Sequence, residues 1–302
     1  MSLIIFGMGY SGRALVRLHR DDLPAPVIGT TRSPENTARL RDLGVGARVF
    51  PGTDMRADFA RATHILISAG PEDGRDPVLK HLAEDFAAVA PRLTWVGYLS
   101  TTGVYGHHGG DWVDETAPLN PATSRGQARV VTEGQWQALA RDHGLPLHIF
   151  RLPGIYGPGR GPFAKVRNGT ARRIIKPGQV FSRIHVEDIA QTLTASMAAP
   201  NPGAIYNVCD DDPAAPEDVI AYAARILNMP LPPATPFEQA EMTPMARSFY
   251  AESKKVSNAR IKDELGVVLK YPTYRAGLDA LLAAEQSGDG AQDCGPRGGG
   301  QG

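Results

Sequence analysis

The chain has 302 residues, and its 32 lysines and arginines balance 32 aspartates and glutamates, so the formal net charge is zero. This balance argues against a nucleic-acid or membrane-surface binder, because both classes need a concentrated basic field. Only two cysteines occur and no apolar stretch is long enough for a membrane span or the core of a signal peptide, so we expect a cytoplasmic protein without disulfides.

Short apolar segments alternate with amphipathic ones through the first half of the chain. The predicted strands are Leu3–Phe6, Val27–Thr30, Ala47–Phe50, His64–Ser68, Thr94–Leu99 and Leu147–Arg151. The predicted helices between them are Gly12–Leu18, Glu35–Leu43, Pro77–Ala90 and Gly126–Asp142. This order favours a parallel sheet with helices on both faces, that is, a Rossmann-type, doubly wound α/β fold.

The pattern loosens after Arg151, where glycine and proline accumulate. Further helices are predicted at Glu187–Met197, Pro216–Leu227, Ser257–Leu265 and Tyr274–Ala284, with a strand at Ala204–Val208 and an irregular segment at Met229–Pro244. We expect a Rossmann domain over residues 1–160 and about 180–209, a small substrate lobe over about 161–179 and 210–285, and a disordered glycine-rich tail over 286–302.

The first predicted strand runs into the turn Gly7-Met8-Gly9-Tyr10-Ser11-Gly12, which has the G-x-G-x-x-G spacing, and then into a helix. In a dinucleotide site, Gly7 allows the tight turn, Gly9 lets the backbone approach a diphosphate, and Gly12 lets the helix pack close to the strand. The alternative is a plain strand-to-helix turn. The flanking strand and helix favour a dinucleotide site formed by Gly7, Met8, Gly9, Tyr10, Ser11 and Gly12.

The end of the second predicted strand indicates which dinucleotide is bound. NAD-binding proteins usually place Asp or Glu there to hold the ribose hydroxyls. This chain has Thr30, Thr31, Arg32 and Ser33 instead. A cation flanked by hydroxyls suits a 2′-phosphate, so NADP is favoured, with Thr30 and Arg32 as contacts. NAD stays an alternative, as does a solvent-exposed Arg32 without a role.

Four motifs in order together resemble the extended short-chain dehydrogenase/reductase superfamily, of the NAD-dependent epimerase/dehydratase type. They are the glycine turn, Leu99-Ser100-Thr101-Thr102-Gly103-Val104-Tyr105-Gly106, Arg151-Leu152-Pro153-Gly154-Ile155-Tyr156-Gly157-Pro158-Gly159, and Ile184-His185-Val186-Glu187-Asp188-Ile189-Ala190. The resemblance implies further cofactor contacts at Asp54, Ser68, Ala69, Gly70, Ser100, Leu152, Pro153, Gly154 and Ile155. It also implies a homodimer formed through the helices at residues 77–90 and 126–142.

The resemblance has two departures, and one is the G-x-G-x-x-G spacing of the glycine turn, where extended members usually have G-x-x-G-x-x-G. Family members usually carry a Tyr-x-x-x-Lys pair, and here Arg125 and Arg129 stand at those positions, as in the atypical branch of the superfamily. An arginine stays charged and only donates hydrogen bonds, so it cannot replace the tyrosine as general acid or base. Arg129 can still donate to the ribose of the cofactor. Arg125 could instead clamp a carboxylate or phosphate of a substrate, or lie in solvent.

Thr101 stands at the family's Ser/Thr position and is a candidate for orienting a carbonyl or alcohol, or for closing the end of its strand. Replacement acids could come from Tyr105, Tyr156, His107 and His108, although packing or surface roles are alternatives for all four. No second ligand pair accompanies the two histidines, so we expect no metal site.

The resemblance implies an NAD(P)-dependent oxidoreductase or epimerase-like enzyme that acts on a small carbonyl, hydroxyl or sugar-type substrate with nonstandard acid–base residues. Arg183 lies two places later than the diphosphate-binding arginine of sugar-nucleotide epimerases, which argues against a nucleotide-sugar substrate, and the short small lobe favours a compact one. The alternatives are a non-catalytic NAD(P)-sensing regulator of the NmrA type and an inactive relic, so whether the chain is an enzyme stays open.

Overall fold

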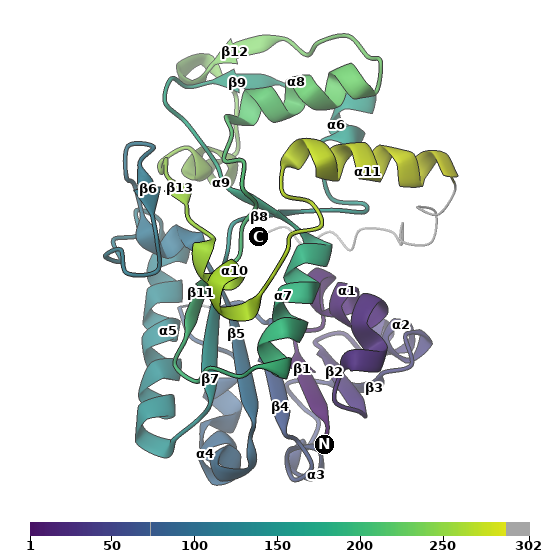
Figure 1. Ribbon diagram of the computed structural model, residues 1–302, viewed down its shortest axis with the longest axis vertical. Helices are drawn as coiled ribbons and strands as arrows, with labels where there is room; N and C mark the ends of the chain where they lie inside the picture. The colour runs from purple at the N-terminus through teal and green to yellow at the C-terminus, as the bar shows by residue number, and fades with distance from the viewer. Residues whose placement is uncertain (73, 288–302) are drawn as a thin grey trace.

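A computed structural model describes residues 1–72 and 74–287, and its centre is a parallel sheet of seven strands (Figure 1). The strand order is β11-β7-β5-β4-β1-β2-β3. The bounds are β1 Leu3–Phe6, β2 Val27–Thr31, β3 Gly46–Val49, β4 His64–Ile67, β5 Trp95–Thr101, β7 Leu147–Leu152 and β11 Ile205–Asn207. The predicted Rossmann-type fold is confirmed.

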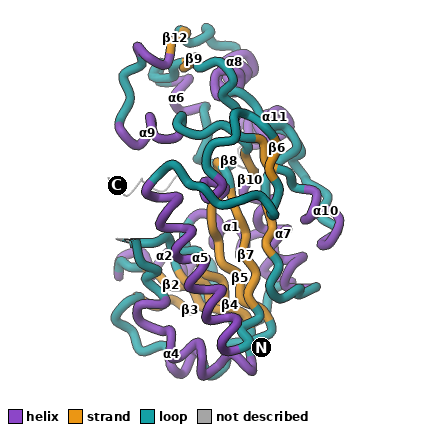
Figure 2. The backbone as a smooth tube through the Cα atoms, turned by 90° about the vertical axis from the view of Figure 1, so that its left-hand side faces the viewer, coloured by secondary structure: helices purple, strands orange, loops and turns teal. Residues whose placement is uncertain are grey.

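Helices cover both faces of this sheet. One face carries α1 Tyr10–His19, α2 Thr37–Asp42, α7 Val186–Ala198 and α10 Ala259–Leu265, and the other carries α3 Arg56–Phe59, α4 Leu79–Val89 and α5 Ser124–His143 (Figures 1 and 2). Successive strand residues point to opposite faces, so Leu3 and Ile5 enter one hydrophobic core while Ile4 and Phe6 enter the other. Burial on both sides explains why β1 is apolar throughout.

The sheet reverses its strand order between β1 and β4. The chain adds β2 and β3 on one side of β1, then returns to place β4 and β5 on the other side. Ligands of open α/β sheets bind at such a switch point, outside the carboxyl ends of the strands. In this protein the segments at that position are Gly7–Gly9 after β1 and Ser68–Gly70 after β4.

A small lobe lies beyond this edge of the sheet (Figure 1). Its elements are α6 Phe163–Arg167, β9 Arg173–Ile175, α8 Pro216–Ile226, β12 Ala234–Pro236, α9 Pro244–Phe249 and α11 Tyr274–Ser287, and it has its own hydrophobic core, which includes Phe163 and Tyr274. The pair β8 Gly154–Tyr156 and β10 Arg183–His185 lies between the large sheet and this lobe. A further short pair is β6 Trp112–Val113 with β13 Lys255–Val256.

Several parts of the chain differ from the sequence predictions, and two of them concern the small lobe and the tail. Ile261, Val267 and Leu269 pack into the core beneath the large sheet, although the lobe boundaries predicted from the sequence include them in the small lobe. The last described residues, Gln286 and Ser287, belong to α11 rather than to a disordered tail, because the helix continues past its last buried turn. The rest of the predicted tail lies outside the described residues.

The two helices expected to form a dimer interface lie side by side on one face of the sheet. Between them is an open hollow of about 490 Å³, whose apolar lining comes from Leu79, Ala83, Ala138 and Leu139. Val131 of α5 is about half exposed on the same helix. The homodimer stays a prediction.

The backbone conformation of Gly7 leads to a prediction about stability. It has φ +72°, and a Cβ built on it would lie 2.8 Å from the Ala69 amide nitrogen, so Gly7→Ala should lower the free energy of unfolding by about 1–3 kcal/mol. The matched control is Gly134→Ala in α5, where no atom lies within 4 Å of the added Cβ and where alanine should stabilise by about 0.5–1 kcal/mol. Urea unfolding measures both changes, and equal stabilities for the two variants would contradict the turn geometry.

Candidate functional site

The glycine turn is held between the ends of three strands. The Gly7 amide donates to Thr30 Oγ1 (2.9 Å), and the Met8 amide donates to the Thr30 carbonyl (2.9 Å). Thr30 is buried, so its side chain supports the turn from below. On the other side, Gly7 approaches Ala69 so closely that only a glycine fits.

Gly9 leaves the mouth of the turn open. A Cβ built on Gly9 would have only the Gly7 carbonyl oxygen near it, at 3.8 Å. Gly9 is also the N-cap of α1, and because it has no side chain, the first amides of the helix lack the side-chain acceptor that usually caps them. Gly12 differs, since a Cβ there would lie 3.2 Å from Ile5 Cγ2, so its role is close helix–strand packing. Open space and uncapped amides together suit an anionic ligand.

Arg129 extends from α5 toward the carboxyl ends of β5 and β4. Its Nη1 donates to the Leu99 carbonyl (2.8 Å) and to the Tyr98 hydroxyl (2.8 Å). Its Nη2 would lie 3.2 Å from a Cβ on Gly70, in the segment that follows β4. The structure therefore brings Arg129 and Ser68–Gly70 together beside the switch point.

Arg125, one helical turn earlier, is exposed and faces a different neighbour. Its guanidinium carbon lies 4.6 Å from the centroid of the Phe249 ring, at the end of α9 in the small lobe. The helix begins after Thr123, whose Oγ1 accepts the Gly126 amide (3.1 Å). Gly126 fits against the Gly103 carbonyl, where a Cβ would lie at 2.8 Å, so the first turn of α5 is fixed next to the end of β5.

Thr101 and Ser100 end β5 in different environments. Thr101 Oγ1 accepts the Gly103 amide (3.1 Å) and is only partly buried. Ser100 is buried, and its hydroxyl donates to Glu133 Oε1 (2.5 Å). The cofactor contact predicted for Ser100 stays a prediction, and the hydroxyl can make it only as an acceptor while it donates to Glu133.

Glu133 belongs to a buried polar network that the sequence analysis did not find. Glu133 and Arg151 are both about 2% exposed and form an ion pair, with Arg151 Nη2 2.7 Å from Glu133 Oε2. Arg151 also donates to the Tyr105 hydroxyl (2.9 Å), which in turn donates to Asn207 Oδ1 (2.7 Å). Burial acts to lower the pKa of Arg151, but the hydrogen bonds to Glu133 and its charge outweigh this and raise it. Two features of the sequence indicate this network. Arg151 ends an apolar predicted strand, and Glu133 lies in the middle of a predicted helix.

The end of β2 carries the residues predicted to select the coenzyme. Arg32 is about 79% exposed and forms an ion pair with Glu72, which follows β4. Thr31 and Ser33 contact each other, with the Ser33 amide donating to Thr31 Oγ1 (3.3 Å). Glu72, which the sequence analysis did not single out, thus supplies a carboxylate at this end of the site.

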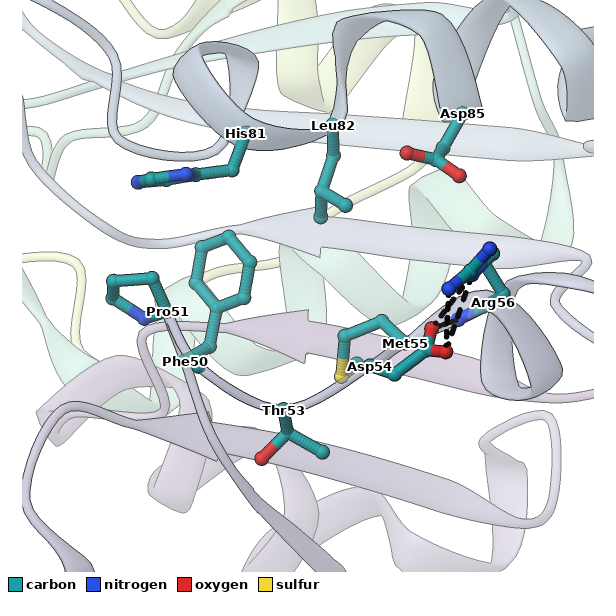
Figure 3. A pocket seen from close by; sticks show the side chains of 10 residues that line it. Phe50, Pro51, Thr53, Asp54, Met55, Arg56, His81, Leu82 and Asp85 are labelled. Atoms are coloured by element: carbon teal, nitrogen blue, oxygen red, sulfur yellow. Dashed lines mark hydrogen bonds and ion pairs between the residues drawn. The ribbon is translucent and has the colours of Figure 1, made fainter.

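Asp54 lines a hollow of about 510 Å³ between the loop after β3 and α4 (Figure 3). Its carboxylate faces Arg56, and the hydrogen bonds from the Arg56 side chain and amide hold the pKa of Asp54 below its usual value. Phe50 and Leu82 supply apolar walls. None of the residues that line this hollow comes from the glycine turn.

The segment after β7 lies beside the end of β5, since Leu152 pairs with Thr101 in the sheet. Leu152 is buried, whereas Pro153 and Ile155 are partly buried and Gly154 is exposed. Gly154 and Ile155 continue into β8, which pairs with β10. These residues therefore lie where the large sheet meets the small lobe.

The comparisons with known proteins agree with this geometry. Residues 83–209 match the NAD-dependent epimerase/dehydratase family. A protein from Silicibacter pomeroyi DSS, described as functionally unknown and conserved, has a solved structure with 58% identity and a TM-score of 0.88, covering 93% of this chain and 98% of that one. Residues 83–209 of this chain therefore form an NAD-dependent epimerase/dehydratase family domain.

Other known proteins are similar to part or nearly all of this chain. Protein YeeZ of Escherichia coli strain K12 is 33% identical over 193 residues, and the match spans only 62% of this chain and 62% of that protein. UDP-N-acetylglucosamine 4-epimerase from Bacillus cereus has 14% identity and a TM-score of 0.77, covering 95% of this chain and 99% of that one. UDP-glucuronic acid 4-epimerase from the same species, solved with NAD, has 15% identity and a TM-score of 0.74 over 95% and 99% of the two chains. At these identities the two epimerases support the fold alone.

The other candidate acids are occupied or buried. Tyr105 is fully buried, and burial raises its pKa to about 12. Burial also raises the pKa of Tyr156. His107 Nδ1 accepts the Ser253 amide (3.0 Å), and His108 Nε2 contacts the Tyr105 carbonyl (3.1 Å).

Within residues 1–72 and 74–287, no group of three or more His, Cys, Asp or Glu side chains is arranged to hold a metal ion. No helix in the same part of the chain combines the length and apolar character needed to cross a membrane.

Proposed function

We propose that this protein binds a nicotinamide dinucleotide, with NADP preferred over NAD, and acts as an oxidoreductase on a compact carbonyl, hydroxyl or sugar-type substrate. The observation that carries the proposal is the open, uncapped turn at Gly9, next to the switch point of the sheet. The epimerase/dehydratase family and the NAD found in structural neighbours such as UDP-glucuronic acid 4-epimerase support it.

The residues around the turn fit such a coenzyme. The amides of Gly9–Gly12 would hold the diphosphate, and Arg32 and Asp54 would serve the adenosine end. Arg129 would donate to the nicotinamide ribose, while Ser68–Gly70 and Leu152–Ile155 would line the rest of the site. When bound, the nicotinamide supplies a hydride acceptor or donor.

The substrate would lie between the end of β5 and the small lobe. Thr101 would orient its oxygen through the hydroxyl, and Arg125 would bind an anionic group, because its guanidinium has only the Phe249 ring as a partner among the described residues. Arg183 is less able to bind an anionic group of the substrate, since its Nη1 already donates to the carbonyls of Phe181 (2.8 Å) and Ala214 (3.2 Å). This favours a compact substrate over one with a second diphosphate.

A non-catalytic, NADP-sensing regulator is the second candidate. The observation in its favour is that Arg125 and Arg129 cannot exchange protons near neutral pH, while Tyr105 and Tyr156 are buried. A regulator needs coenzyme binding but no acid or base, so the same site would serve it.

Gly9→Val tests the coenzyme site. The added side chain would occupy the position of the diphosphate, so affinity for NADP should fall about a hundredfold or more. Isothermal titration calorimetry measures the affinity, and thermal unfolding verifies that the variant is folded. Wild-type affinity in a folded Gly9→Val protein would contradict the proposal.

Arg32 and Glu72 test the coenzyme preference. Arg32→Ala should weaken NADP about tenfold and leave NAD nearly unchanged, because the guanidinium would bind only the 2′-phosphate. Glu72→Gln should strengthen NADP relative to NAD, since a carboxylate next to Arg32 repels that phosphate. The exposed Arg32–Glu72 pair itself is worth little, so neither change should alter stability. An equal loss of NAD and NADP affinity in Arg32→Ala would remove the NADP assignment.

Turnover separates the enzyme from the regulator. With NADPH and a panel of small anionic carbonyl compounds, an enzyme should show loss of nicotinamide absorbance, and Arg125→Ala should raise KM about tenfold while kcat changes less. Arg141→Ala is the control, since Arg141 lies on the same helix and pairs with Asp142 at its other end. Absence of turnover, together with a protein partner whose affinity follows the NADP/NADPH ratio, would favour the regulator.

A further inference from the structure

A tight hairpin after β8 lies against the start of α1. The Gly157 amide donates to the Arg160 carbonyl (2.8 Å), and the Arg160 amide donates back to the Gly157 carbonyl (2.9 Å). Gly157 has φ +152°, and a Cβ on it would lie 2.6 Å from the Tyr10 hydroxyl and 2.8 Å from Val186 Cγ1. The hairpin can therefore approach the first residue of α1 only because position 157 carries no side chain.

Tyr10 links this hairpin to the glycine turn. Tyr10 directly follows Gly9, and its hydroxyl donates to the Pro158 carbonyl (3.0 Å). The Arg160 guanidinium lies over the same ring, with its carbon 5.5 Å from the ring centroid. Segments about 150 residues apart in sequence thus hold an arginine next to the mouth of the turn.

Within the described part of the chain, no acid neutralises the charge of Arg160. The side chain is exposed, and among the described residues no carboxylate lies within ion-pair distance of it. By contrast, two arginines of the small lobe are paired with acids, Arg167 with Glu285 and Arg275 with Asp212. A cation that is positioned by a hairpin and an aromatic ring, without an acidic partner, is available to an anionic ligand.

We infer that Arg160 binds the diphosphate of the dinucleotide from the side opposite the turn, an inference that rests on the proposed coenzyme function. The turn offers only neutral amide donors, whereas the diphosphate carries negative charge that the amides do not cancel. A guanidinium supplies that charge and can donate to two phosphate oxygens at once. The hairpin between the two parts of the molecule thus becomes part of the coenzyme site.

The test compares Arg160→Gln with Arg172→Gln. Arg172 is an exposed arginine of the small lobe that donates only to the carbonyls of Gly169 and Ala171, so this control removes the same charge elsewhere. Calorimetry with NADP, ADP-ribose and adenosine 2′-monophosphate separates the diphosphate from the adenosine end, because the third probe has no diphosphate.

Arg160→Gln should raise the dissociation constants of NADP and ADP-ribose about tenfold and leave that of adenosine 2′-monophosphate unchanged. Arg172→Gln should change none of the three. If Arg160→Gln binds NADP and ADP-ribose like the wild type, or weakens all three probes equally, Arg160 does not bind the diphosphate. If the wild type itself binds neither NADP nor ADP-ribose, the coenzyme proposal fails and this inference fails with it.

Discussion

The close approach of Gly7 to Ala69 is the constraint on which the rest of the site depends. The two strands at the switch point, β1 and β4, end side by side, and a Cβ on Gly7 would lie within 3.0 Å of three Ala69 atoms. Because Gly7 has no side chain, the turn can pass between the ends of β2 and β4. This path places Gly9 in open space at the start of α1. The hydrogen bonds from Gly7 and Met8 to Thr30 then fix the turn from the other side.

A second constraint fixes α5, which carries both arginines of the site. The buried Glu133–Arg151 pair ties this helix to β7, and Ser100 ties the same glutamate to β5. A buried ion pair is weak evidence of stability, because desolvating two charges offsets much of their attraction, but removal of one partner would leave an uncompensated charge. Its role here is positional, because it holds α5 against β7 and β5.

The sequence predicted the elements whose signals are local. Apolar strands such as Leu3–Phe6 and the glycine turn could be located because periodicity and spacing are visible within a few residues. The two-residue strands β6 and β13 could not, because their pairing joins residues about 140 positions apart. The same holds for the contacts that shape the site. The Arg125–Phe249 stack and the Tyr10–Pro158 hydrogen bond each join distant segments, and nothing in either segment alone indicates its partner.

The central claim is that the amides at Gly9–Gly12 hold the diphosphate of a nicotinamide dinucleotide. The most direct measurement is a crystal structure of the wild-type protein soaked with millimolar NADP. The account predicts electron density for a diphosphate within hydrogen-bond distance of the Ser11 and Gly12 amides. Density for the coenzyme elsewhere, or a turn that stays empty at saturating NADP, would contradict it.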